Sequence, residues 1–227
     1  MRVLILFSIL NFSLFASNLQ MLQISGVKAN IDNKQIIIER EVPSECIEFG
    51  MVPELFWSED FASKKVSSKC KKSFITTKGV VLPIKYNENI KTIGELEVLD
   101  FIKNRLLKEP QKYALIDVRR ESWFKLGTIP TAINIPFDEF EKDEFFMDLF
   151  ENSMKKLNVK KIDSKYSFKD AKKIVIFCNG AWCKQSFYAI NNLIKIGYPQ
   201  KKILWYRGGI HSWNSMSFTL YKPKSND

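Results

Sequence analysis

Two cysteines lie five residues apart in the segment 174–186, whose sequence is IVIFCNGAWCKQS. Cys178 follows an all-apolar run directly, and the short loop after it leads into a predicted helix. The positive end of a helix and a ring of backbone N–H groups lower the pKa of a thiol and stabilise negative charge on sulfur. The pattern therefore predicts chemistry on sulfur, with Cys178 as a reactive, ionised and accessible nucleophile.

Other interpretations of these cysteines stay open at the level of sequence. Cys178 can be an inert buried thiol, because cysteine is among the most buried residue types. Cys183 has either a structural role or a redox role, in which it resolves a Cys178 persulfide to a disulfide or protects the thiol from over-oxidation. We expect no metal site, since two thiols and the single histidine, His211, fall short of four ligands. His211 is expected to pack locally.

The other two cysteines, Cys46 and Cys70, lie in a stretch without any other catalytic signature. The simplest interpretation is a structural disulfide. It would close a loop of about 25 residues and contribute roughly 3 kcal/mol.

The first 16 residues have the pattern of an export signal. Arg2 provides a positive start, Val3–Leu14 is apolar, and the small residues Ala16 and Ser17 suit cleavage. The apolar run is shorter than the roughly 20 residues of a spanning helix, so we expect no stable membrane span after cleavage. The pattern predicts a periplasmic or otherwise exported protein, in which disulfides persist.

The composition is that of a globular protein, with 45% hydrophobic residues in a chain of 227. The net charge of +10 comes mostly from lysines scattered along the chain. A nucleic-acid interface would show a cluster that includes arginine, so we do not expect nucleic acid as a partner. Small anions are attracted by such a charge.

The order of predicted elements indicates how the cysteines are positioned. A small N-terminal region, residues 17–90, contains two predicted strands, Gln35–Glu41 and Gly79–Tyr86, and precedes a domain over residues 91–220 and a polar tail, 221–227. In the domain, strands alternate with helices, which predicts a parallel α/β sheet with helices on both faces. The predicted elements are a helix that starts at the capping box Thr92–Glu95, a strand at 113–118, a short helix at 121–126, a strand at 132–135, a helix at 143–157 with Phe146, Leu149, Phe150 and Leu157 inside, a polar connection at 158–172, a strand at 174–177, a helix at 184–196, a strand at 203–206 and a helix around Trp213.

Four motifs in this order resemble the rhodanese family. ALIDVR (114–119) is similar to the family's first strand with its Asp-Val-Arg signature, and GTIPTAINIP (127–136) to its Gly-His-Ile-Pro-Gly-Ala-Ile-Asn-Ile-Pro segment. The strand, cysteine and loop of 174–184 resemble the family's active-site region, and Arg207-Gly208-Gly209 with Trp213 resembles its closing motif. The resemblance implies a rhodanese-like fold over residues 91–220, with the N-terminal region outside it.

The resemblance also implies a function. Family members transfer a sulfane sulfur from a donor such as thiosulfate to a thiophilic acceptor, through a cysteine persulfide. Carried onto this chain, the catalytic residue is Cys178, Asp117 and Arg119 support the site, and no cofactor is needed. The active-site loop is then formed by Asn179, Gly180, Ala181, Trp182, Cys183 and Lys184.

This chain departs from the family pattern inside that loop, where active members often carry arginine or lysine to hold thiosulfate. Here the nearest cation is Lys184, just past the loop. The donor is therefore either a small sulfur-containing anion or a protein persulfide, and the acceptor is a thiol. Phosphatase activity is not expected, because the loop is shorter than in phosphate-binding relatives and lacks their arginine. The alternatives to a sulfurtransferase are a thiol–disulfide protein that uses Cys178 and Cys183, and a non-catalytic rhodanese-like binding module.

Overall fold

A five-stranded parallel sheet forms the centre of the computed structural model, which describes residues 26–39 and 82–223. The strands follow the order β3-β9-β8-β4-β5. Their bounds are Lys91–Thr92 for β3, Ile203–Tyr206 for β9, Lys173–Phe177 for β8, Tyr113–Asp117 for β4 and Ile133–Asn134 for β5. The apolar runs of β4 and β8 are buried because both faces of the sheet are covered. The predicted fold class is confirmed.

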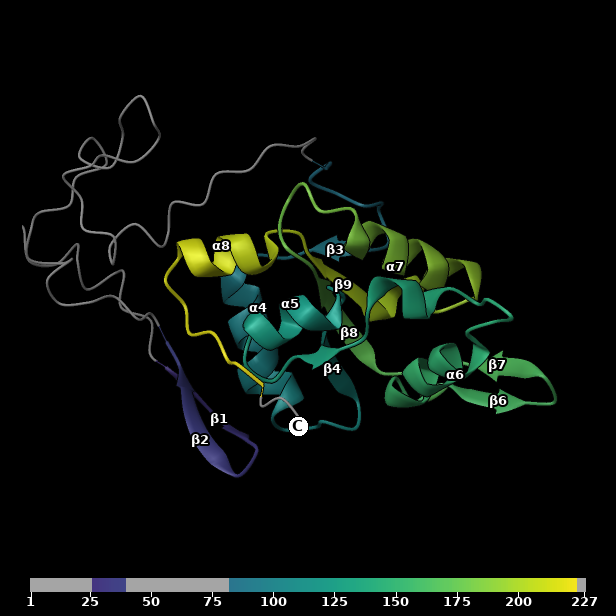
Figure 1. The fold of residues 1–227 in the computed structure, drawn as a ribbon, viewed down its shortest axis with the longest axis horizontal. Helices are drawn as coiled ribbons and strands as arrows, with labels where there is room; N and C mark the ends of the chain where they lie inside the picture. Colours follow the sequence, from purple (N-terminus) through teal and green to yellow (C-terminus); the bar gives the residue numbers. More distant parts are fainter. Residues whose placement is uncertain (1–25, 40–81, 224–227) are drawn as a thin grey trace, which may run out of the picture.

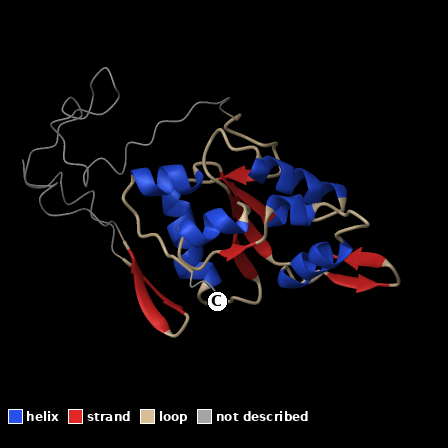
Figure 2. Ribbon diagram, in the orientation of Figure 1, coloured by secondary structure: helices blue, strands red, loops and turns tan. Residues whose placement is uncertain are grey.

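Helices cover both faces of this sheet (Figures 1 and 2). The helices α6 and α7 pack on one face, and α4, its π-helical continuation η2, and α8 pack on the other. Their bounds are Glu95–Phe101 for α4, Ile102–Leu106 for η2, Met147–Lys156 for α6, Gln185–Lys195 for α7 and Gly209–Ser215 for α8; the shorter helices are α5 (Glu121–Leu126), η3 (Phe137–Phe140) and η4 (Gln200–Lys202).

The alternation of side chains along β8 decides on which face Cys178 lies. Ile174 and Ile176 contribute to the core on the α7 side, and Val175 and Phe177 to the core on the α4 side. Continuing the alternation, Cys178 belongs to the α7 side and is part of that core. Its sulfur is thereby placed at the start of the helix that follows.

The N-terminal strands form a hairpin, β1 (Val27–Ile31) and β2 (Lys34–Ile38), which extends away from the sheet on the side opposite to the β6–β7 hairpin (Figure 2). Its turn residues Asp32 and Asn33 both have positive φ, as hairpin turns of this length require. The buried face of the hairpin packs into the core on the α4 side. The extra N-terminal strands are therefore confirmed, and they share a core with the sheet.

The predicted capping box at Thr92 and Glu95 is wrong. The helix α4 is capped at Gly94, whose N–H donates to the carboxylate of Glu97 at 3.0 Å. Thr92 belongs to β3, where it pairs with Trp205 of β9. Because Thr92 is paired in the sheet, the helix starts two residues later and is capped by the carboxylate of Glu97.

The helix predicted at 143–157 starts later than expected, at the beginning of α6. Asp143 instead forms a turn, in which its carbonyl accepts the N–H of Phe146. Phe150 and Leu157 are buried as predicted, but Phe146 is 62% exposed and Leu149 47% exposed. The assignment of the last two to the inner face is therefore wrong, because Phe146 precedes the helix as its N-cap and the buried side of α6 is formed by Phe150, Ser153 and Met154.

The connection predicted at 158–172 contains a hairpin, β6 (Lys160–Ile162) and β7 (Lys165–Ser167). The described part of the strand predicted at Gly79–Tyr86, residues 82–86, has no strand pairing, so that prediction is wrong there.

The predicted signal at 1–16 and the predicted Cys46–Cys70 disulfide lie outside the described residues. Within the described ranges, no helix combines the length and apolar character needed to cross a membrane.

Candidate active site

The loop 178–184 begins where β8 ends and closes on itself before α7. The N–H of Cys183 donates to the carbonyl of Gly180 at 2.9 Å, which makes a tight turn. The ring of Trp182 lies across Gly180, so close that a Cβ on Gly180 would come within 2.4 Å of it. A side chain at position 180 would therefore have to displace the Trp182 ring, which folds back over the backbone of the loop.

The start of α8 holds this loop from one side. The N–H groups of Ile210 and His211 donate to the carbonyls of Cys178 and Asn179, at 3.0 and 2.8 Å. Gly209 makes this approach possible, because its φ is +57° and a Cβ there would lie 2.2 Å from the Cys178 carbonyl oxygen. The Gly-Gly motif after β9 thus fixes the position of the cysteine loop.

Residues 82–86, which we call the strap, hold the loop from another side. The N–H of Leu82 donates to the carbonyl of Ala181 at 2.7 Å. The guanidinium of Arg207 donates to the carbonyls of Leu82 and Pro83 through three hydrogen bonds of 2.6 to 3.1 Å. Leu82 is buried in the same core as Cys178, which is only 2% exposed. The expected accessible sulfur is therefore covered in this conformation.

Two polar side chains connect the Cys178 sulfur to the core. The Sγ of Cys178 lies 3.3 Å from the Oγ of Ser186, in the first turn of α7. The indole N–H of Trp205 donates to the same oxygen at 3.0 Å. The Ser186 oxygen accepts from the indole and from the S–H of Cys178, and when Cys178 is ionised the Ser186 hydroxyl donates to its thiolate. This contact favours negative charge on Cys178.

Burial nevertheless dominates the electrostatics of Cys178. It raises the pKa of the Cys178 thiol well above its ordinary value, and the neighbouring Cys183 raises it further. The hydrogen bond from Cys178, together with backbone N–H groups of Asn179 and Gln185, lowers the pKa of Cys183 to about 6. The prediction that Cys178 is the ionised sulfur is therefore wrong for this conformation. Of the amide groups expected around Cys178, the backbone N–H groups of Asn179 and Gln185 lower the pKa of Cys183, and the N–H of Ser186 remains for Cys178.

Asp117 and Arg119 form a buried network beside the site. The guanidinium of Arg119 contacts the Asp117 carboxylate at 2.7 Å and also donates to the Gly127 carbonyl at 2.6 Å. The hydroxyl of Thr128 donates to the same carboxylate at 2.7 Å. The amide of Asn134 donates to the carbonyls of both residues of the pair. These bonds brace the segments after β4 and before β5, and among the described residues no bond connects them to Cys178 or Cys183.

Two observations limit what the loop can bind. Lys184 is exposed at the end of the loop, at the N-cap of α7, and residues 178–183 hold no cation. In the part of the chain that the structure describes, no group of three or more ligating side chains could hold a metal ion. The sequence analysis did not single out three residues around the Cys178 sulfur: Ser186, which lies 3.3 Å from it, Trp205, which donates to Ser186, and Leu82, which is buried in the same core. Ser186 alone could have been found from the sequence, as a polar residue in the first turn of the helix after the loop.

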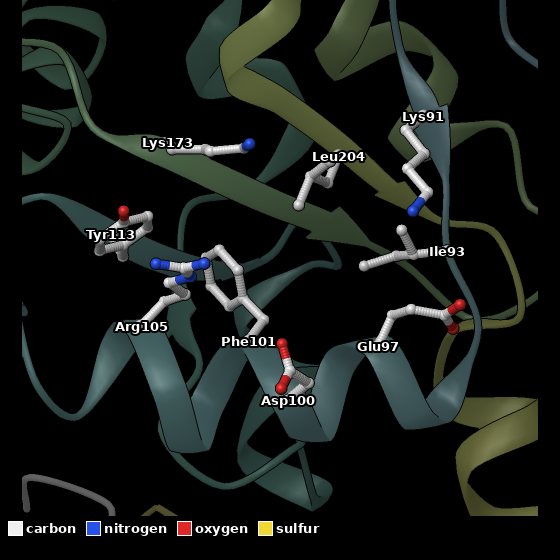
Figure 3. A pocket seen from close by; sticks show the side chains of 9 residues that line it. All are labelled: Lys91, Ile93, Glu97, Asp100, Phe101, Arg105, Tyr113, Lys173 and Leu204. Carbon is white, nitrogen blue, oxygen red and sulfur yellow. The ribbon is translucent and has the colours of Figure 1, made fainter.

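A separate hollow of about 460 Å³ lies between α4 and the sheet (Figure 3). Lys91, Tyr113 and Lys173 are the first residues of three parallel strands and line it. Cys178 follows the opposite end of β8, about 16 Å away along a strand of five residues. This hollow is therefore not part of the cysteine site.

The comparisons with known proteins agree with this geometry. The family model described as "Rhodanese-like domain" matches residues 101–216, about half of the chain. The chain belongs to the rhodanese-like domain family. No curated protein matches it.

Solved structures with related folds were also found. The BH2092 protein of Bacillus halodurans is 21% identical, with a TM-score of 0.42, and the match covers 58% of this chain and 76% of that one. A human single-domain sulfurtransferase is 22% identical, with a TM-score of 0.33 and coverages of 54% and 93%. The thiosulfate sulfurtransferase of Pseudomonas aeruginosa is 17% identical, with a TM-score of 0.39 and coverages of 60% and 21%.

Proposed function

We propose that this protein is a sulfurtransferase that carries a sulfane sulfur as a persulfide on Cys178. The observation that supports this most is the position of the Cys178 sulfur. It lies at the end of a central strand, inside a closed loop, and faces the hydroxyl and backbone N–H of Ser186 at the start of α7. A persulfide on Cys178 carries its charge near this helix start, where N–H groups stabilise it.

The burial of Cys178 implies two requirements for this reaction. The thiol must lose its proton, because the thiolate is the nucleophile. The strap must also move, because Leu82 packs in the core that encloses the sulfur. An enclosed persulfide is in turn protected from water and from reaction with unintended thiols.

The charges beside the cysteine loop indicate which classes of sulfur donor suit the site. Lys184 is exposed beside the loop and can attract an anionic donor, but no cation inside the loop holds two charged oxygens of thiosulfate. A persulfide presented by a small thiol or by a protein needs less cationic contact. We therefore propose both classes of donor, a thiol as acceptor, and an exported location for the protein.

Thiocyanate formation from cyanide and a sulfane donor tests this function. Cys178→Ser is expected to abolish it, whereas Cys183→Ser retains much of it. Glu121→Gln, in an exposed ion pair with Lys125, changes neither the loop nor a sulfur and is the control. Transfer that survives Cys178→Ser would overturn the proposal.

A second candidate function is thiol–disulfide exchange by the pair Cys178 and Cys183. The observation in its favour is that both are free thiols and that the Cys178 sulfur lies 3.3 Å from the carbonyl oxygen of Cys183. In this case both Cys178→Ser and Cys183→Ser abolish turnover with a dithiol reductant, and the oxidised protein contains a disulfide between the two. Absence of that disulfide after oxidation would exclude this function.

A further inference from the structure

We propose that the hollow between α4 and the sheet binds a small organic anion, in which a carboxylate, sulfonate or phosphate group is attached to a flat apolar body. The hollow lies at the end of the sheet opposite to Cys178, so this inference does not depend on sulfur transfer. Its volume of about 460 Å³ lies in the range of small-molecule sites, about 300–1,000 Å³.

The register of the sheet brings the strand residues of the hollow together at the start of the strands. Lys91 of β3 pairs with Leu204 of β9, and Tyr113 of β4 pairs with Lys173 of β8. Since β9 separates β3 from β8, the two lysines belong to strands about 10 Å apart. The hollow is therefore bordered by ammonium groups from two strands, with the helix α4 across from them (Figure 3).

Three cations line the hollow: Lys91, Arg105 and Lys173. Within residues 26–39 and 82–223, none of the three forms an ion pair. Lys91 and Arg105 lie at opposite ends of the hollow in Figure 3, and Lys173 lies on β8. Like charges that share one hollow repel each other, and an anion bound among them removes this cost.

The two acidic residues of the hollow already accept hydrogen bonds from neutral donors. The carboxylate of Glu97 accepts the N–H of Gly94 at 3.0 Å, and that of Asp100 accepts the side-chain amide of Asn104 at 2.6 Å. Three cations and two carboxylates leave the lining with a net charge of +1. The excess positive charge favours an anion over a cation or a neutral ligand.

The apolar side chains of the hollow indicate that this anion is organic. Phe101 and Ile93 are buried beneath it, and Phe101 packs edge-on against Tyr113, with ring centroids 5.7 Å apart. Tyr113 and Leu204 are only half-buried, so part of their apolar surface still faces water. A flat apolar body removes that surface from water, whereas an inorganic anion leaves it exposed.

NMR titration of the full chain with three probes tests this inference. Naphthalene-2-sulfonate carries the charge and the apolar body, naphthalene-2-sulfonamide carries the same body without the charge, and methanesulfonate carries the charge alone. In about 0.15 M salt, the first is expected to bind about 10-fold more tightly than either of the others. The backbone amide signals that shift should be those of residues that line the hollow, such as Lys91 and Leu204.

Variants of opposite charge effect locate the binding. Lys91→Gln combined with Lys173→Gln should weaken naphthalene-2-sulfonate binding about 10-fold, and Asp100→Asn should tighten it about 2-fold or more, because it removes a repelling carboxylate. The matched control is Lys195→Gln combined with Lys201→Gln, which removes the same charge at exposed positions outside the hollow and should leave the affinity within about 2-fold. Equal urea midpoints show that the variants are folded.

Several outcomes would overturn the inference. They are equal binding of the neutral sulfonamide, unchanged affinity when both lysines of the hollow are replaced, signals that shift only outside the hollow, and no shift at the highest soluble probe concentration. Vesicles of anionic phospholipid or duplex DNA that displace the probe, and bind equally well to the hollow variant and the control variant, would also overturn it, because they indicate a diffuse cationic surface.

Discussion

Removal of the Arg207 guanidinium tests whether the strap controls access to Cys178. Arg207→Met deletes three hydrogen bonds to the carbonyls of Leu82 and Pro83. Hydrogen bonds from a charged donor contribute about 1.5–3 kcal/mol each when buried, but this guanidinium is partly exposed and its two acceptors regain water. We therefore expect the strap to lose about 1–2 kcal/mol in total. The bond from the N–H of Leu82 to the carbonyl of Ala181 remains.

This loss raises the population of the open strap by about 5- to 30-fold. When opening is fast compared with labelling, the rate at which Cys178 is alkylated rises by the same factor. The assay is iodoacetamide labelling at one fixed pH, in a Cys183→Ser background, with peptides mapped by mass spectrometry. Lys85→Ala is the matched control, because Lys85 lies in the strap but only pairs with the exposed Glu88. An unchanged rate in Arg207→Met, with an unchanged urea midpoint, would refute the strap as the barrier.

Three further predictions concern the support of the site. Asp117→Asn breaks a buried ion pair and should lower the free energy of unfolding, measured in urea, by about 3–5 kcal/mol. Glu121→Gln, in an exposed pair, should change it by less than about 1 kcal/mol. Equal losses of stability in the two variants would contradict a stabilising role of the buried network. Gly209→Ala should leave little folded protein, because its Cβ meets the Cys178 carbonyl; wild-type melting would refute this contact. Ser186→Ala should slow persulfide formation about 5-fold through the loss of about 1 kcal/mol, and an unaffected rate would exclude its role.

The sheet could be predicted from the sequence because its signals are local. The apolar runs of β4 and β8 are typical of buried strands, and β9 was predicted with the bounds that the structure shows. The hairpin β6–β7 could not be predicted, because its lysine-rich strands of three residues lack an apolar alternation. The cap of α4 was missed for a different reason. Pairing with β9 takes Thr92 into the sheet, and that contact is distant in sequence.

The cysteine site was predicted in position but not in charge. The strand, the loop and the helix after it place Cys178 and Cys183 together, as their spacing indicated. The charge depends on burial in a core that also contains Leu82, which is almost 100 residues away and belongs to a segment predicted as a strand. Burial penalises the thiolate of Cys178 more than the amide groups stabilise it. The sequence around Cys178 does not indicate burial by residues that are so distant along the chain.

The most direct test of the central claim is the location of a transferred sulfur. Purified full-length protein is incubated with a sulfane donor, its intact mass is measured, and the modified peptide is identified. The account predicts a gain of one sulfur atom on Cys178, which is lost again when a thiol acceptor is added. No gain with either thiosulfate or a persulfide donor, or a gain confined to another cysteine, would contradict it.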